Sequence, residues 1–186
     1  MPGSVRKLVA VVAVGLLAAA QLVSSAQAAG NPGIVFSSPV AADGITAWPG
    51  DADKTPEHAA STAPTLWRGD SLQFAISDGL PGENATSTEI GAALLPTGPA
   101  VYTFAPTTGA TPGAAADITR AGSVTSYRIE VPWTALGFTA QPTGPIAISL
   151  ALNENDGAGR AGAMQWASGI VTGKTTTLYL PGTFTG

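Results

Sequence analysis

Apolar and polar residues alternate along two well separated segments of this chain, and the alternation constrains the fold more than any other feature. In the segment 71–77 every second residue is apolar, and the longer segment 146–153 repeats the pattern with four aliphatic residues. A repeat of two residues is the pattern of a β-strand with one buried face. No 12-residue window after the N-terminal apolar run carries a helical stripe. The sequence therefore predicts an all-β protein.

Further short apolar segments fit the same architecture, because turns rich in Gly and Pro separate them at spacings of roughly 10 to 20 residues. Short strands joined in this way favour an antiparallel β-sandwich. The additional predicted strands cover 34–36, 89–95, 101–104, 127–131, 164–166 and 177–180, and the segment 107–116 is predicted as a loop.

The first 28 residues have the form of a secretory signal peptide. Arg6 and Lys7 precede an apolar run, and Ala26-Gln27-Ala28 supplies the small residues of a cleavage site. The run of about 13 residues is too short to span a bilayer. We therefore expect a secreted, extracellular chain that starts at Ala29 or Gly30 and has no membrane attachment after cleavage.

The remaining chain divides into a weakly patterned segment, 29–63, and a segment with all the clear strand signals, 64–186. Roughly 155 to 160 residues form one domain and suffice to bury a core. Loss of Arg6 and Lys7 lowers the basic residues from 8 to 6 against 12 acidic ones, which moves the net charge from −4 to about −6. This charge argues against nucleic acid or an anionic membrane as a partner, because binding to either needs clustered Lys and Arg.

The sequence contains no catalytic constellation. Cysteine is absent, which excludes thiolate nucleophiles and disulfides. Gly69-Asp70-Ser71-Leu72 has the letters of an esterase nucleophile motif, but the only histidine, His58, lies upstream of the serine and supplies no base in the expected place. No pair of carboxylates is indicated by spacing for glycoside hydrolysis. We therefore expect a protein that is not an enzyme.

A candidate cation site follows the longest predicted strand. Asn153, Asn155 and Asp156 bring oxygen ligands next to glycines, and such a cluster either binds calcium or forms a hydrogen-bonded turn. The spacing does not match the helix-loop-helix calcium motif. Calcium is the one cofactor that the sequence suggests, and the hydrogen-bonded turn is its alternative.

Three segments together resemble the family 9 carbohydrate-binding modules. Residues 66–76 are similar to that family's Trp-x-x-Asp-Ser strand, and 127–137 to its Tyr-x-x-Glu segment that ends in Pro-Trp and Gly. Residues 146–166 are similar to its long apolar strand followed by Asn, Asp, Gly and Arg and closed by Trp. The resemblance extends over 66–180. It implies an antiparallel β-sandwich of the carbohydrate-binding-module type, often with calcium, as found in secreted proteins of polysaccharide catabolism.

The resemblance also implies a sugar site. Trp67 matches a tryptophan that stacks on the sugar, and Gln73 stands where the family has a sugar-contacting Glu. Trp133 and Trp166 match tryptophans that we take as structural. The segment 167–176 lacks the second stacking aromatic.

Two further departures from the family pattern concern an arginine and the N-terminus. The family's sugar-contacting Arg is replaced by Gly91 or a neighbour. The family begins with additional strands, so the resemblance implies a domain shortened at its N-terminus.

Two functions follow from these residues. The first is non-catalytic binding of a polysaccharide or oligosaccharide of the xylan or cellulose type through Trp67 and Gln73. The second is a structural or interaction domain with the same fold and a degraded sugar site, or an accessory module associated with glycoside hydrolases. The alternative for Trp67 itself is a core position against Tyr127 or Trp133, where most tryptophans lie.

Overall fold

The computed structural model describes residues 7–14, 62–121, 124–155 and 159–184. These residues form strands and short 3₁₀ helices, as the all-β prediction requires, and none of the helices among them is long and apolar enough to cross a membrane. The 3₁₀ helices are η2 (Ala63–Arg68), η3 (Trp133–Leu136) and η4 (Thr176–Leu178). The strands are β1 (Lys7–Val14), β2 (Ser71–Asp78), β3 (Thr88–Leu95), β4 (Gly98–Ala105), β5 (Gly109–Ala110), β6 (Ala115–Ala121), β7 (Val124–Pro132), β8 (Ile146–Asn155), β9 (Arg160–Trp166) and β10 (Leu180–Gly182).

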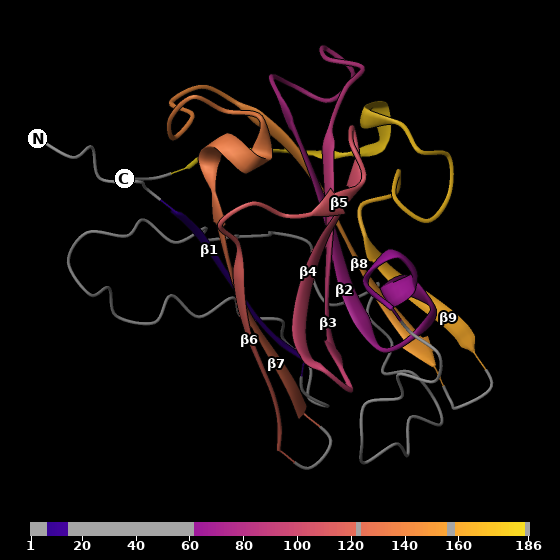
Figure 1. Ribbon diagram of the computed structural model, residues 1–186. Helices are drawn as coiled ribbons and strands as arrows, with labels where there is room; N and C mark the ends of the chain where they lie inside the picture. The colour runs from indigo at the N-terminus through magenta and orange to yellow at the C-terminus, as the bar shows by residue number, and fades with distance from the viewer. Residues whose placement is uncertain (1–6, 15–61, 122–123, 156–158, 185–186) are drawn as a thin grey trace, which may run out of the picture.

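The strands form two antiparallel sheets (Figure 1). The smaller sheet has three strands in the order β1-β7-β6. The larger sheet has seven strands, in the order β10-β8-β2-β3-β4-β5, with β9 also paired to β8. Both β9 and β10 pair with the same edge of β8, β10 along its first residues and β9 along its last. The central position in the larger sheet belongs to β2 and β8, the two strands with the clearest alternation.

The core between the two sheets explains that alternation. Every second residue of β2 points into it, and the matching residues of β7 meet them from the smaller sheet. Helix η3 closes one end with two buried side chains. The largest members of this core are Leu72, Phe74, Ile76, Ile90, Ile118, Tyr127, Ile129, Val131, Trp133, Leu136 and Ile146.

The opposite face of the larger sheet is covered by two separate elements. Helix η2 places Leu66 against Ala93 and Leu95 of β3. The loop after β9 places Ile170 and Tyr179 against alanines of β2 and β8. All residues of β2 from Ser71 to Ser77 are therefore buried, because both faces of this strand are covered. The polar residues of β2 lie on this second face, and their burial creates the site described below.

Two sequence predictions differ from the structure. The predicted loop 107–116 contains the two residues of β5 and the start of β6, whose small residues Ala115 and Ala116 hide the alternation. The predicted strand 177–180 is instead helix η4 followed by β10, which begins only at Leu180. A short 3₁₀ turn and a short apolar strand have the same composition, so a run of this length does not separate them.

Strand β1 lies within the predicted signal peptide, 1–28, and pairs with β7 over its whole length. The signal peptide remains a prediction, and its removal would take this neighbour away from β7. The predicted strand 34–36 lies outside the described residues.

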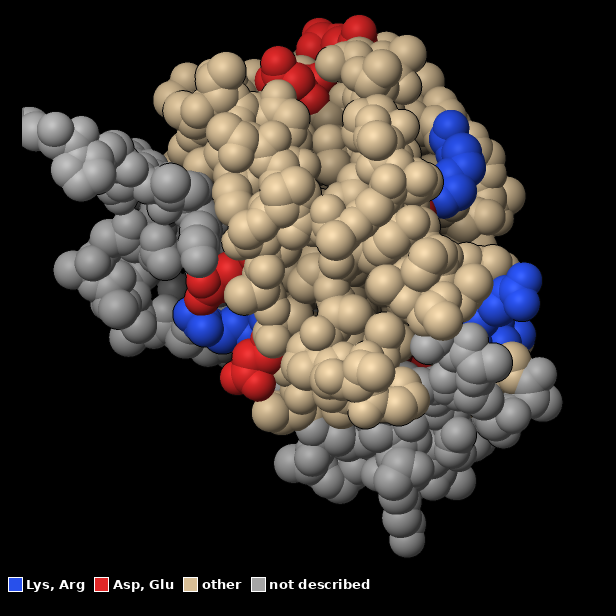
Figure 2. Space-filling view, viewed as in Figure 1, with Lys and Arg blue, Asp and Glu red and all other residues tan. Residues whose placement is uncertain are grey.

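The face in Figure 2 carries few charged groups, which matches a chain with only 11% charged residues.

Gly91 positions helix η2 on the sheet. A Cβ atom at Gly91 would lie 2.5 Å from Leu66 Cδ1 and 2.7 Å from Phe104 Cε2, both closer than packed carbon atoms allow. We expect Gly91→Ala to lower the free energy of unfolding by about 1–3 kcal/mol, the usual cost of overpacking. Gly144→Ala is the matched control, because nothing lies within 4 Å of its Cβ position. Urea denaturation of both variants is the measurement, and equal stabilities would contradict this placement of η2.

Candidate functional site

A pocket of about 280 Å³ opens between the two elements that cover the second face of the larger sheet. Its size is close to the lower end of the range for ligand pockets, about 300–1,000 Å³. Buried polar residues of β2 and β3 form its floor, and η2 and the loop after β9 form its walls. The lining residues are Trp67, Gln73, Glu89, Phe104, Arg160, Ile170, Val171 and Lys174.

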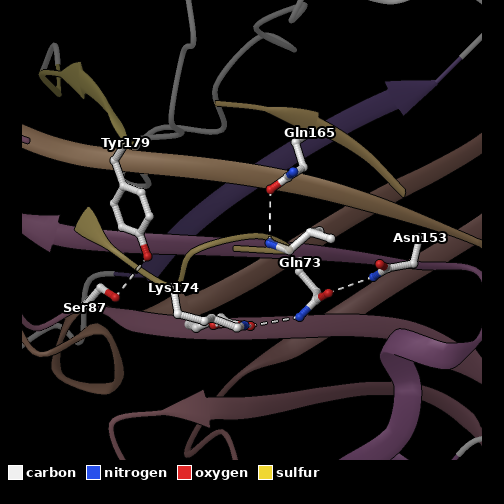
Figure 3. Close-up of polar contacts among 8 residues, drawn as sticks. Gln73, Ser87, Asn153, Gln165, Lys174 and Tyr179 are labelled. Carbon is white, nitrogen blue, oxygen red and sulfur yellow. Dashed lines mark hydrogen bonds and ion pairs between the residues drawn. The ribbon is translucent and has the colours of Figure 1, made fainter. Parts of the chain in front are cut away.

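The floor is a chain of hydrogen bonds across three neighbouring strands (Figure 3). Asn153 Nδ2 of β8 donates to Gln73 Oε1 at 2.8 Å, and Gln73 Nε2 donates to Glu89 Oε1 of β3 at 2.9 Å. Lys174 Nζ, from the loop, donates to both oxygens of Glu89 at 2.7 Å. Glu89 is only 5% exposed, so this ion pair and the Gln73 bond compensate its lost hydration.

This hydrogen-bond chain has a direction. Because Gln73 Oε1 accepts from Asn153, the Gln73 amide must turn its N–H groups toward Glu89. Donors from Gln73 and Lys174 thereby hold the carboxylate of Glu89, which lines the pocket. Asn153 orients Gln73, and Gln73 orients Glu89.

The wall formed by η2 presents the half-buried ring of Trp67, flanked by two arginines. The Cζ atoms of Arg68 and Arg160 lie 5.0 and 5.9 Å from the ring centroid, within the range of cation–π attraction. Burial lowers the pKa of Arg160 from its ordinary value. The guanidinium still remains charged at neutral pH, because an arginine pKa starts above about 12.

The opposite wall is aliphatic, with Ile170 and Val171, and the sheet holds it in place. Gln165 Oε1 of β9 accepts a hydrogen bond from the Val171 N–H at 3.0 Å, as Figure 3 shows. The hydroxyls of Tyr179 and Ser87 lie 3.1 Å apart at the far end of the loop. Burial raises the pKa of Tyr179, so this phenol stays protonated and able to donate.

The structure brings the two predicted sugar-site residues into one pocket. Trp67 forms a wall, and Gln73 lies in the floor with both ends of its amide in hydrogen bonds. The sequence reasoning did not identify Glu89, Arg160 and Lys174 as site residues. Glu89 is the one charged residue in the predicted strand 89–95, and this was the available sign. No feature of the sequence around Lys174 indicates its role, because its partner Glu89 is 85 residues away in the chain.

The two other described tryptophans, Trp133 and Trp166, do not line this pocket. Trp133 is 2% exposed in the core between the sheets, with Phe138 and Phe184 packed edge-on against it. Tyr127 belongs to the same core. Trp67 lies on the other face of the larger sheet, so it does not pack against either residue. Trp166 ends β9 and is half-buried.

The serine of the esterase-like motif is not placed for catalysis. Ser71 is 1% exposed, and its Oγ accepts a hydrogen bond from Asn153 Nδ2 at 3.0 Å. Asp70 beside it is also buried, and it accepts the Asn155 N–H at 3.0 Å. His58 lies outside the described residues.

The described part of the predicted calcium site fits the hydrogen-bonded turn. Asn155 Oδ1 accepts from the Gly159 N–H at 2.9 Å, which closes the turn between β8 and β9. Asn153 points its amide at Ser71 and Gln73 on the sheet face, away from that turn. Calcium needs six to eight oxygen ligands that converge on one point. These two asparagines do not supply them together, and Asp156 lies outside the described residues, so calcium stays a prediction.

The geometry defines an all-β sandwich with a polar-floored, aromatic-walled pocket on the outer face of its larger sheet. No family model and no curated protein matches this sequence. The chain is similar in structure to a family 9 carbohydrate-binding module from Caldicellulosiruptor kristjanssonii, solved in complex with glucose and in complex with cellotriose. Both comparisons have a TM-score of 0.53 and 12% identity and cover 72% of this chain.

The chain spans 66% and 65% of the length of those two structures. This likeness confirms the fold that the sequence resemblance predicted, an antiparallel β-sandwich of the family 9 carbohydrate-binding-module type. At such low identity the likeness concerns the fold.

Substitution of two tryptophans tests the placement of Trp67 at the pocket. We expect Trp133→Ala to lower the free energy of unfolding by about 3–5 kcal/mol, the cost of emptying a core tryptophan position. Trp67→Ala should cost clearly less, because its ring is half-buried and already borders open space. Urea denaturation of the two variants gives the comparison. A loss at Trp67 as large as that at Trp133 would assign Trp67 to the core.

Calcium dependence of the melting temperature tests the turn. We expect the same melting temperature in calcium and in a chelator, because Asn155 Oδ1 accepts the Gly159 N–H and the Asn153 side chain lies against Ser71 and Gln73 on the sheet. A ligand that binds only the folded state would raise it by mass action. A clear rise with calcium, absent with magnesium, would show that the hydrogen-bonded turn is the wrong interpretation.

Proposed function

We propose that this chain is a secreted, non-catalytic carbohydrate-binding protein that takes part of a polysaccharide or oligosaccharide into the pocket between η2 and the loop after β9. One observation carries the proposal. The half-buried ring of Trp67 and the buried pair Gln73 and Glu89 line the same pocket. A sugar ring has an apolar face and an edge of hydroxyls, and this pocket offers a partner for each.

Glu89 is the main hydrogen-bond partner in this proposal. A carboxylate accepts hydroxyl protons in charge-assisted bonds, which are stronger than bonds between neutral groups. Gln73 is engaged at both ends, so its principal role is to orient Glu89, and its second N–H remains for a sugar oxygen. The carboxylate that the family resemblance places at position 73 is thus supplied from the neighbouring strand.

The proposed ligands are β-linked glycans of the xylan or cellulose type. Support comes from the fold and from the two similar structures, whose ligands are glucose and cellotriose. The pocket is small, which favours recognition of a short unit or a chain end over a long stretch of polymer.

A structural or interaction domain is the second candidate, and one specific observation favours it. The wall opposite Trp67 is formed by Ile170 and Val171, so an aliphatic surface stands where the family pattern has a second aromatic ring. With one aromatic wall the stacking contribution is smaller. Such a domain would keep the sandwich, would not bind glycans, and could accompany glycoside hydrolases as an accessory module.

Affinity electrophoresis against xylan, a soluble cellulose derivative and a soluble chitin derivative separates the two candidates. We expect xylan or the cellulose derivative to retard the mature protein. Trp67→Ala should weaken the apparent affinity at least about tenfold, since truncating an aromatic anchor costs about 2 kcal/mol or more. Glu89→Gln should weaken it as well. Leu80→Ala is the control, because Leu80 is 45% exposed and does not line the pocket.

The outcomes distinguish the candidates directly. Retardation that is lost in the pocket variants and kept in Leu80→Ala supports carbohydrate binding at this site. Unretarded migration on every glycan would favour the structural domain. Retardation that is unchanged in Trp67→Ala and Glu89→Gln would move the binding site to another surface.

A further inference from the structure

The charges at the pocket do not cancel. Three charged residues line it, and two of them, Glu89 and Lys174, form the ion pair described above. Arg160 is the third. Arg68 adds another positive charge at the other contact with the Trp67 ring. The chain as a whole carries a net charge of −4, so this local excess of positive charge runs against its overall balance.

Arg160 has unused hydrogen-bonding capacity. Among the described residues its recorded acceptor is the Gly162 carbonyl, 3.4 Å from Nε. The two terminal nitrogens of the guanidinium, with their four N–H groups, have no hydrogen-bond acceptor among the described residues. Partial burial removes some of the hydration of this guanidinium, and a negatively charged ligand would offset that loss.

The surface around the pocket reinforces the same preference. In Figure 2 blue groups lie along the right-hand edge, on the side where β9 lies in Figure 1, and another blue group lies beside red groups at the lower left. A ligand that reaches the Trp67 ring must approach between or beside two guanidinium groups. A neutral sugar can accept hydrogen bonds from these guanidinium groups, whereas a carboxylate gains an ion pair as well.

We infer that the pocket prefers an acidic glycan, in which a uronic acid residue packs against Trp67 and its carboxylate pairs with the Arg160 guanidinium. The two oxygens of a carboxylate match the forked donors of arginine, which makes the contact directional as well as attractive. Arg68 contributes a longer-range attraction. This inference rests on the proposed carbohydrate function. It narrows the ligand to acidic glycans, which a pocket without this positive charge would not distinguish from neutral ones.

Calorimetry with two matched ligands tests the inference. The first is a xylo-oligosaccharide with a glucuronic acid branch, and the second is the same compound after reduction of its carboxyl group to the neutral alcohol. We expect the acidic ligand to bind at least about tenfold more tightly at low salt, because hydrogen bonds between two charged groups are stronger than those with a neutral hydroxyl. The difference should shrink as ionic strength rises.

Substitutions assign the preference to Arg160. Arg160→Gln should remove the difference in affinity between the two ligands, and Arg160→Lys should restore only part of that difference, since lysine lacks the fork. Arg128→Gln is the control of equal charge, because Arg128 pairs with Glu130 on β7 at 2.6 Å and does not line the pocket. It should leave the preference unchanged.

Each outcome decides the inference. Equal affinity for the acidic and the reduced ligand overturns it and leaves the proposed carbohydrate function standing. Lack of binding by both ligands overturns the two together. Displacement of the acidic ligand by acetate at similar concentration would indicate a site for any carboxylate and would also overturn it. If Arg160→Gln does not fold, the comparison of the two ligands on the unsubstituted protein decides alone.

Discussion

Strand β2 is buried on both faces, and the rest of the structure follows from how each face is satisfied. Apolar residues at every second position meet the smaller sheet and form the core. The residues between them, including Ser71, Gln73 and Ser77, are polar and equally buried. Buried polar groups must find partners inside the protein. Each of these three does so with a group on another strand or loop, and the pairing of Gln73 creates the polar floor of the pocket.

The pocket exists because the cover over this face is incomplete. Helix η2 and the loop after β9 each bury a small apolar cluster on the sheet, and the two clusters do not meet. Gly91 allows η2 to approach the sheet closely, and Gln165 ties the loop to β9. Between the two apolar clusters the sheet carries Gln73 and Glu89. An apolar cover over this part of the sheet would bury the Glu89 carboxylate without a partner.

The polar groups of the pocket differ in position from the pattern that the family resemblance implies. A glutamine stands at the position of the expected carboxylate, and Glu89 on the adjacent strand supplies one 2.9 Å from its amide. The expected arginine is missing near Gly91, while Arg160 and Lys174 bring positive charge from β9 and the following loop. A carboxylate and positively charged donors are thus present, but they come from other elements of the chain. The second aromatic wall is replaced by aliphatic side chains.

The sequence by itself determined the strands with a clear two-residue repeat, the all-β class, and the candidates Trp67 and Gln73. These depend on local alternation and on short motifs, which are visible in any single segment. It missed β6, where alanines hide the repeat, and misjudged 177–180, where strand and 3₁₀ turn share one composition. Only the tertiary structure decided that Glu89 meets Lys174 and that two arginines flank Trp67. Glu89 and Lys174 are 85 residues apart, and sheet pairing across such a distance leaves no trace in the local pattern of either segment.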